Sequence, residues 1–239
     1  MRSLYVCNPS MHRVVRVPSG PNNARFQNLG FGHLPKRNEY KIVNMFKGDK
    51  MKCEIFSFKS GENVQSGSWR TIKDCPSNNA WWMDGYPVCA NGIMYWTLSS
   101  LCENKSILCL NLENEEFSSI CYPVHGNRKY SFLECVGLMG DLRVVGLSAE
   151  EPKTIDIWAS NDKEKEVWGI ECRVDLFPLC PKFIIPTCDG ESEEILVHIS
   201  EKDLICYNVR SGTWRRVDYY KGMKTYNKPC LYYDSLVPL

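Results

Sequence analysis

The chain has 239 residues, of which 44% are hydrophobic and 24% charged; this composition is typical of a globular protein and excludes a largely disordered one. Its 29 basic and 28 acidic residues nearly cancel, so it lacks the broad positive field on which nonspecific binding to nucleic acid or anionic membranes depends. No apolar run approaches the roughly 20 residues of a membrane helix. We therefore expect a soluble domain without a nucleic-acid or membrane partner.

Five copies of one strand pattern follow one another along the chain. Each copy is an apolar strand, a polar turn and a second strand that usually opens on an aromatic residue. The first strands are expected at residues 4–7, 53–58, 107–110, 155–158 and 204–207, and the second strands at 14–17, 69–72, 117–120, 167–170 and 214–217. Their spacing of about 45 to 55 residues is close to that of kelch-like propeller blades.

Two further strands precede each of the last four pairs, for example 87–90 and 93–96 across the turn Asn91-Gly92. Four strands per unit with almost no helical periodicity predict an all-β, kelch-like β-propeller of about five to six four-stranded blades, folded as a single domain over residues 1–239. A β-sandwich with coincidental spacing is the alternative. The first blade is incomplete, and the strand expected at 229–237 is a candidate to complete it.

Cysteines, histidines and glycines give no sign of a metal or cofactor. The 13 cysteines are scattered without a Cys-x-x-Cys pair and the four histidines lie far apart, which indicates a reducing, intracellular compartment (cytoplasm or nucleus) and no zinc site. Gly30 and Gly32 match two glycines of a dinucleotide fingerprint, but the third glycine and the helix are missing. We expect these glycines to let an inner strand pack closely against its neighbours.

An enzyme that uses the central channel of the propeller, for example a hydrolase, is the alternative from another functional class. It needs ionisable side chains that converge on the axis. Glu134 is the only charged residue on the strands expected to be innermost, at 88–90, 132–136 and 183–185. We therefore assign no catalytic residue.

Aromatic residues divide into two groups. Trp69, Trp158, Trp168 and Trp214 recur at matching strand positions, so we expect them in the core. A second group is expected in loops that join one blade to the next, at 74–85, 124–130 and 219–226, and that emerge on one face. Because aromatic, Arg and Met side chains are enriched in protein interfaces, we predict that this face binds a protein partner. The predicted contact residues are Trp81, Trp82, Tyr86, His125, Arg128, Tyr130, Tyr220, Met223 and Tyr226. In the alternative interpretation, Trp81 and Trp82 fold back to cover the end of the core.

Several fragments, in this order, resemble the F-box associated domain of plants. They are Leu4-Tyr5-Val6-Cys7-Asn8-Pro9-Ser10, Gly30-Phe31-Gly32, Asn38-Glu39-Tyr40-Lys41-Ile42-Val43, Ser68-Trp69-Arg70, residues 88–96, Asp156-Ile157-Trp158 and Ser235-Leu236-Val237. The resemblance covers nearly the whole chain. It implies a propeller and a non-catalytic role in substrate recognition for an SCF-type ubiquitin ligase.

The sequence carries no F-box, the N-terminal helical module with which such receptors engage a Skp-type adaptor. The resemblance therefore implies an adaptor and a cullin as partners only if an F-box is supplied upstream. Otherwise the chain is expected to be an orphan binding domain without a ligase role. The target protein is the partner expected in either case.

Overall fold

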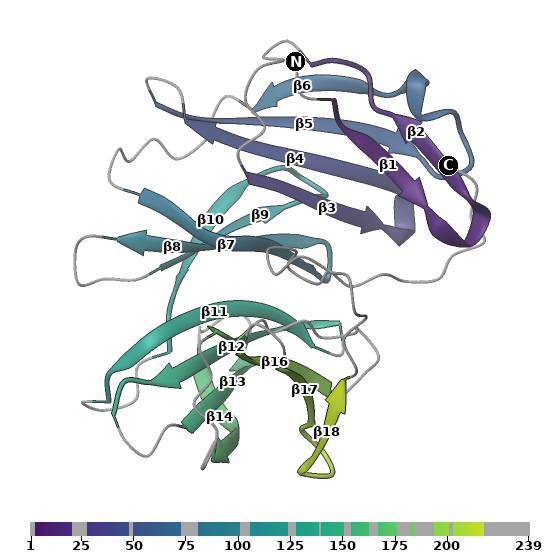
Figure 1. The fold of residues 1–239 in the computed structure, drawn as a ribbon. Coiled ribbons are helices and arrows are strands. Elements are labelled where there is room, and N and C mark those ends of the chain that lie inside the picture. The colour runs from purple at the N-terminus through teal and green to yellow at the C-terminus, as the bar shows by residue number, and fades with distance from the viewer. Residues whose placement is uncertain are drawn as a thin grey trace. The chain divides into compact units, whose positions relative to one another are not determined.

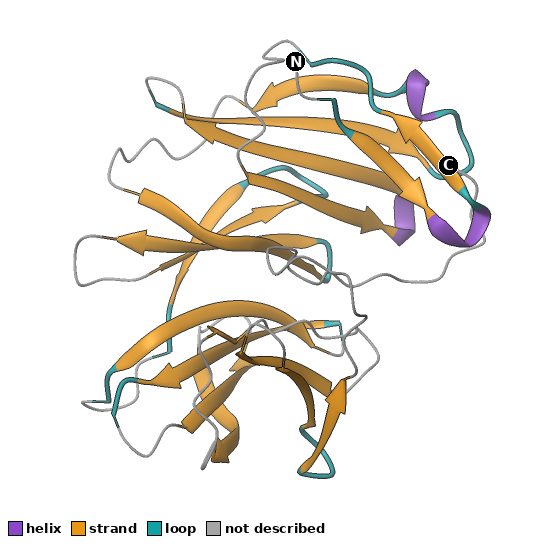
Figure 2. Cartoon of the chain, in the orientation of Figure 1, coloured by secondary structure: helices purple, strands orange, loops and turns teal. Residues whose placement is uncertain are grey.

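The computed structural model describes residues 3–20, 28–47, 50–72, 81–100, 106–123, 128–138, 140–150, 154–162, 167–175, 183–184, 194–200 and 203–217. Strands make up most of this part of the chain (Figures 1 and 2). The helices within it are 3-10 turns of three residues, far too short to cross a membrane. They are η1 (Pro9–Met11), η2 (Pro35–Arg37) and η3 (Val64–Ser66).

The strands follow the order of the chain. They are β1 (Tyr5–Asn8), β2 (Arg13–Arg16), β3 (Asn28–Leu34), β4 (Glu39–Lys47), β5 (Met51–Lys59), β6 (Ser68–Ile72), β7 (Trp81–Ala90), β8 (Ile93–Ser100), β9 (Ser106–Asn111), β10 (Phe117–Cys121), β11 (Tyr130–Leu138), β12 (Asp141–Ser148), β13 (Thr154–Asp162), β14 (Val167–Asp175), β15 (Phe183–Ile184), β16 (Glu194–Ser200), β17 (Asp203–Asn208) and β18 (Thr213–Val217).

Each group of four consecutive strands forms one sheet. Strands β3 to β6, β7 to β10, β11 to β14 and β15 to β18 give four sheets, and β1 and β2 form a fifth, two-stranded sheet. The pairings with a described register are antiparallel. The predicted all-β fold and its four-stranded blades are confirmed. Within the described residues, the incomplete first blade holds only the pair β1 and β2.

The chain divides near Ile120 into two compact units. In the first unit, one face of the β3–β6 sheet packs against the β7–β10 sheet through a cluster that includes Val43, Ile55 and Trp96. A Cβ atom on Gly30 would lie 2.7 Å from the Met94 sulfur, and one on Gly32 would lie 2.9 Å from the Cys89 sulfur. The two glycines therefore permit a close approach of β3, as the sequence predicted.

The β1–β2 pair covers part of the opposite face of the β3–β6 sheet. Val6 and Val17 lie in one buried cluster with Phe56, and Trp69 packs against it. The indole Nε1 of Trp69 donates a hydrogen bond to the carbonyl oxygen of Pro18 at 2.8 Å. The incomplete first blade is thus held on its neighbour by apolar packing and by this hydrogen bond.

The four strand tryptophans, one in the first unit and three in the second, differ in burial. Trp158, in the interior strand β13, is 2% exposed, as predicted. Trp69 and Trp168 are half-buried, whereas Trp214 is 37% exposed, so a core position for Trp214 is wrong. The reason is its place in β18, the outermost strand of its sheet, where its ring contacts Tyr207 at a centroid distance of 4.5 Å.

Candidate protein-binding surface

Trp81, Trp82 and Tyr86 lie in strand β7, so the loop predicted for them is wrong. Trp81 pairs with Ser100 and Trp82 with Ser99 on β8. Aromatic residues favour strands, and the pairing of β7 with β8 continues through this segment with a register shift between Asp84 and Val88. Their predicted role in partner binding stays a prediction.

Four more of the predicted contact residues lie outside the described part of the chain. They are His125, Tyr220, Met223 and Tyr226. The single face on which the three loops were expected to emerge therefore stays a prediction as well. Arg128 and Tyr130 are described, and both lie at the start of the β11–β14 sheet.

Arg128 and Tyr130 converge on the carboxylate of Asp156. The Tyr130 hydroxyl donates to Asp156 Oδ2 at 2.7 Å, and Arg128 Nη1 donates to the same oxygen at 3.3 Å. Arg173, which pairs with Asp156 across β13 and β14, donates from Nε to Oδ1 at 2.5 Å and from Nη2 to Oδ2 at 3.0 Å. Arg128 Nη2 also donates to the Thr154 hydroxyl at 3.1 Å.

The Asp156 side chain is completely buried, at 0% exposure. Burial acts to raise the pKa of Asp156, but the hydrogen bonds from Arg173 and Tyr130 and the two guanidinium charges outweigh it and hold the pKa below its ordinary value. Burial, together with the Asp156 carboxylate, raises the pKa of Tyr130. At neutral pH Asp156 is therefore ionised and the Tyr130 hydroxyl is protonated. The cluster orders the sheet, and a contact of Arg128 or Tyr130 with a partner stays a prediction.

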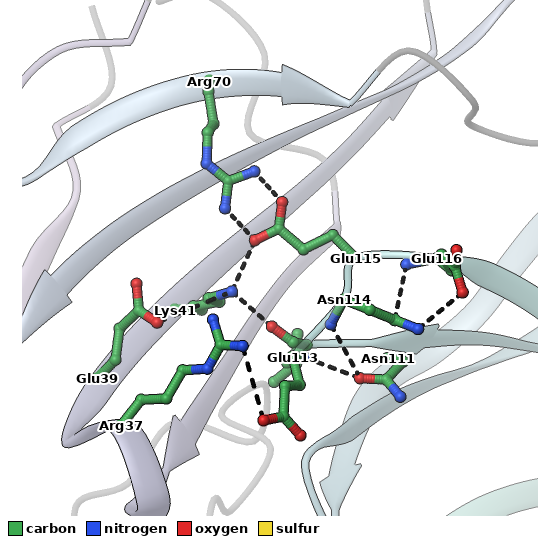
Figure 3. A network of polar contacts seen from close by, with 10 residues as sticks. Arg37, Glu39, Lys41, Arg70, Asn111, Glu113, Asn114, Glu115 and Glu116 are labelled. Atoms are coloured by element: carbon green, nitrogen blue, oxygen red, sulfur yellow. Dashed lines mark hydrogen bonds and ion pairs between the residues drawn. The ribbon is translucent and has the colours of Figure 1, made fainter.

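A second buried charge lies in the first unit, where Lys41 on β4 is 2% exposed (Figure 3). Its Nζ donates to the carbonyl oxygen of Leu112 at 2.5 Å and to Glu115 Oε1 at 2.6 Å. Arg70 on β6 donates from both Nη atoms to the same carboxylate. Glu115 thus links two strands of one sheet to the turn between β9 and β10.

The β9–β10 turn is shaped to present Glu115. Asn111 Oδ1 accepts hydrogen bonds from the backbone N–H groups of Glu113 and Asn114, at 2.8 and 3.4 Å (Figure 3). Glu115 has a φ of 63°, in the left-handed region that non-glycine residues seldom adopt. Burial lowers the pKa of Lys41, and the Glu39 carboxylate opposes this. The charged groups of this network contact one another, and through Glu115 they join the β3–β6 sheet to the β7–β10 sheet.

Two side chains that could in principle take part in catalysis, Cys89 and Glu134, are at least partly buried. Burial raises the pKa of the Cys89 thiol to about 11, so this thiol is protonated and a poor nucleophile at neutral pH. Glu134 is half-buried in β11, opposite Val145. No group of three or more His, Cys, Asp or Glu side chains that could hold a metal occurs in the part of the chain that the structure describes.

An aromatic ladder crosses the first three strands of the β3–β6 sheet. It consists of Phe31 and His33 on β3, Tyr40 on β4 and Phe58 on β5, strands that are paired in this order (Figure 1). The Tyr40 ring is stacked on the other three, with centroid distances of 5.5 Å to Phe31, 4.4 Å to His33 and 5.3 Å to Phe58. The inner end is buried and the outer end is open, because Phe58 is 4% and Phe31 51% exposed.

The aromatic ladder was not found by sequence reasoning, although a signal was present. Alternation places Phe31 and His33 on one face of β3, and the turn at η2 brings Tyr40 opposite His33. Burial lowers the pKa of His33, so its ring is neutral at pH 7 and belongs to the apolar surface.

Comparison with known proteins identifies one family over nearly the whole chain. The family model described as the F-box associated beta propeller domain matches residues 1–237. The "Putative F-box protein At5g52610" of Arabidopsis thaliana is 23% identical over 71% of this chain and 47% of its own length. The "F-box/kelch-repeat protein At2g43270" of the same plant is 27% identical over 39% of this chain and 50% of its own length.

The chain spans about half the length of the curated relatives it matches. Among solved structures, TolB from Acinetobacter baumannii aligns with 90% of this chain and 52% of its own, at 12% identity and a TM-score of 0.48. A score at this level does not bear on the assignment. The family match rests on the sequence, and the four-stranded antiparallel sheets agree with it.

Proposed function

We propose that this chain, which belongs to the family of F-box associated beta propeller domains, is the substrate-recognition part of an SCF-type ubiquitin-ligase receptor. The observation that carries the proposal is the family match over residues 1–237, together with curated relatives that are named F-box proteins. In this role the chain binds a target protein and leaves the chemistry to other subunits.

The structure supports a binding role through the contrast between its charges and its apolar groups. The buried charges Asp156 and Lys41 are each matched by hydrogen bonds within the fold. Phe31 is the open end of an ordered row of rings on a rigid sheet. Rigid aromatic side chains on a scaffold are favourable anchors for protein partners because little conformational entropy is lost when they bind.

A Skp-type adaptor and a cullin enter the proposal only with the whole protein. Those contacts are assigned to an F-box, and the chain covers 47% of the relative At5g52610 and 43% of At3g52320. The two steps of the proposal are therefore separate. The first is capture of a target by this domain inside the cell, and the second is ubiquitination of that target by the assembled ligase.

Affinity capture followed by a degradation assay tests both steps. The immobilised chain is incubated with plant-cell extract, the enriched proteins are purified, and each is titrated against the chain in solution. We expect at least one saturable partner whose ubiquitination falls, and whose amount rises, when the gene for the chain is silenced. A partner with unchanged ubiquitination would contradict the ligase role alone. The absence of any saturable partner would contradict the recognition role.

A further inference from the structure

Acidic residues are distributed unevenly along the chain, and the segment without any of them supplies strands around the aromatic ladder. The first 38 residues contain six lysines and arginines and no aspartate or glutamate, and all 28 acidic residues of the chain follow Asn38. This segment supplies β1, β2, β3 and η2. A nearly neutral chain therefore has a first segment whose charged side chains are all basic.

The basic side chains of this segment that the structure describes are exposed. They are Arg13 and Arg16 on β2 and Lys36 and Arg37 on η2. The Glu113 carboxylate lies 3.6 Å from Arg37 and partly neutralises it, so Arg13, Arg16 and Lys36 are the main basic groups of this surface. The positive charge is thus presented at the surface.

Two of these basic residues come from elements that adjoin the aromatic ladder. The helix η2 follows β3 directly after His33 and Leu34, so Lys36 stands at the end of the strand that carries the ladder. On β2, Arg13 and Val15 share a face, because alternate residues of a strand point the same way. Val15 packs against the buried cluster that Tyr40 also contacts. The rings therefore lie on the sheet face that the β1–β2 pair, with its exposed Arg13 and Arg16, also covers, and β3 leads directly into the turn with Lys36.

From this juxtaposition we infer that the aromatic ladder and these basic residues bind an extended, acidic segment of a protein, with an apolar side chain of that segment packed on Phe31. The inference rests on the proposed function and specifies its partner. Positive surroundings repel a cationic side chain, so a cation–π contact with lysine or arginine is disfavoured. Carboxylates, by contrast, gain from the arginines, and the open Phe31 ring offers apolar area.

Aromatic rings beside cations are also a feature of single-stranded nucleic-acid sites, where bases stack on open ring faces. The aromatic ladder is less suited to that use. Tyr40 is already stacked on three neighbours, and its ring lies within 7° of parallel to Phe31. Few ring faces are left for bases, whereas ring edges and the outer side of Phe31 suit aliphatic or aromatic side chains.

Fluorescence anisotropy with defined probes tests the inference on the full chain. The main probe is a labelled peptide of roughly ten residues in which glutamate alternates with valine around a central phenylalanine, a pattern suited to an extended strand. One comparison peptide carries lysine in place of glutamate. The other comparison probe is a labelled deoxythymidine oligonucleotide. We expect saturable binding of the acidic peptide, weakened at high salt, and weaker binding of both comparison probes.

Variants locate the site. Phe31→Ser is expected to weaken peptide binding about tenfold, and Arg13→Glu about fivefold, in line with the loss of an anchor and of a rim charge. Lys50→Glu is the matched control, because Lys50 is exposed at the end of the β3–β6 sheet opposite η2, and it should change the affinity less than about twofold. Unchanged melting temperatures exclude misfolding, since Phe31 and Arg13 are exposed.

Each contrary result overturns the inference in a recognisable way. No binding of the acidic peptide, or equal binding by Phe31→Ser, excludes the aromatic ladder as its site. Equal binding of the lysine peptide excludes the acidic chemistry, and tighter, Phe31-dependent binding of the oligonucleotide shows that the surface reads nucleic acid. A target that is captured with the same affinity by wild type and Phe31→Ser leaves the proposed function intact and removes this inference alone.

Discussion

The two buried charges of the molecule have opposite signs and are stabilised in different ways. Asp156 is a buried anion within one sheet. Its carboxylate accepts from the guanidinium groups of Arg128, just before β11, and of Arg173 on β14, and from the Tyr130 hydroxyl on β11. Lys41 is a buried cation between two sheets, with one carboxylate and one carbonyl oxygen as its closest partners. Several hydrogen-bond donors stabilise the Asp156 carboxylate, whereas Lys41 depends on the single carboxylate of Glu115 at hydrogen-bond distance.

This difference shows how a propeller-type repeat uses charge. Within a sheet, cross-strand pairing places Arg173 opposite Asp156, so the register itself forms the contact. Between sheets, the contact needs a turn of unusual geometry to bring Glu115 to Lys41. The substitutions below separate these two kinds of joint.

Asp156→Ala is expected to have the largest effect. It removes the anion and leaves the Tyr130 hydroxyl and the two arginines without their common acceptor, at a cost of about 3 kcal/mol in the free energy of unfolding. Urea unfolding measures this cost. Asp141→Ala is the control, because Asp141 is 40% exposed and 3.9 Å from Arg143, and it should cost less than about 0.5 kcal/mol. Equal effects of the two variants would show that burial of Asp156 contributes nothing.

Glu115→Ala is expected to destabilise the first unit by about 2 kcal/mol, because the Lys41 charge loses its carboxylate partner while it stays buried. The Leu112 carbonyl and Glu39, 3.9 Å from Lys41, reduce the loss. Glu116→Ala is a neighbouring control whose carboxylate accepts from the exposed Asn114 side chain. A loss for Glu115→Ala no larger than for Glu116→Ala would contradict the joint.

Acid pH tests the Asp156 cluster more finely. The folded-state pKa of Asp156 is lowered, so its stabilisation is fully present above the pKa of an unfolded aspartate, about 3.9, and is lost as the pH falls through the lower folded value. Wild-type stability should therefore fall more steeply than that of Asp156→Asn below about pH 4. Parallel curves of unfolding free energy against pH would show that Asp156 has an ordinary pKa in the fold.

Lys41→Met is expected to have the smallest effect, within about 1 kcal/mol of wild type, because the apolar side chain avoids the desolvation of a buried ammonium group. Arg70 still neutralises Glu115 in this variant. The decisive comparison is that Glu115→Ala should lower the free energy of unfolding more than Lys41→Met does. A loss for Lys41→Met as large as for Glu115→Ala would mean that the hydrogen bonds of Lys41, rather than its charge, hold the sheets together.

Repetition in the sequence predicted the sheets well, because strand alternation and turn residues recur in each unit. The same repetition misplaced Trp214. Trp158 and Trp214 occupy strands of similar pattern, but β13 is an interior strand and β18 an edge strand, and position in the sheet decides burial. Gly30 and Gly32 were placed correctly because alternate glycines in a strand favour a close approach of a neighbouring strand, which the structure shows.

Contacts between distant residues could not be predicted in the same way. The partners of Asp156 come from Arg128, Tyr130 and Arg173, and no local pattern indicates that these residues meet. For Trp81 and Trp82, strand propensity prevailed over the polar residues around them. The aromatic ladder follows from the register of β3, β4 and β5, which the sequence indicates only when all three strands are read together.

The most direct test of the account is a calorimetric titration of the purified chain with the protein it enriches most strongly from extract. Recognition by a preformed surface predicts saturable, one-to-one binding with a Kd of about 10 μM or tighter. It also predicts the same Kd for Lys41→Met, which changes only a buried joint. Heat without saturation, or a Kd that weakens markedly with Lys41→Met, would contradict recognition by a preformed surface of this domain.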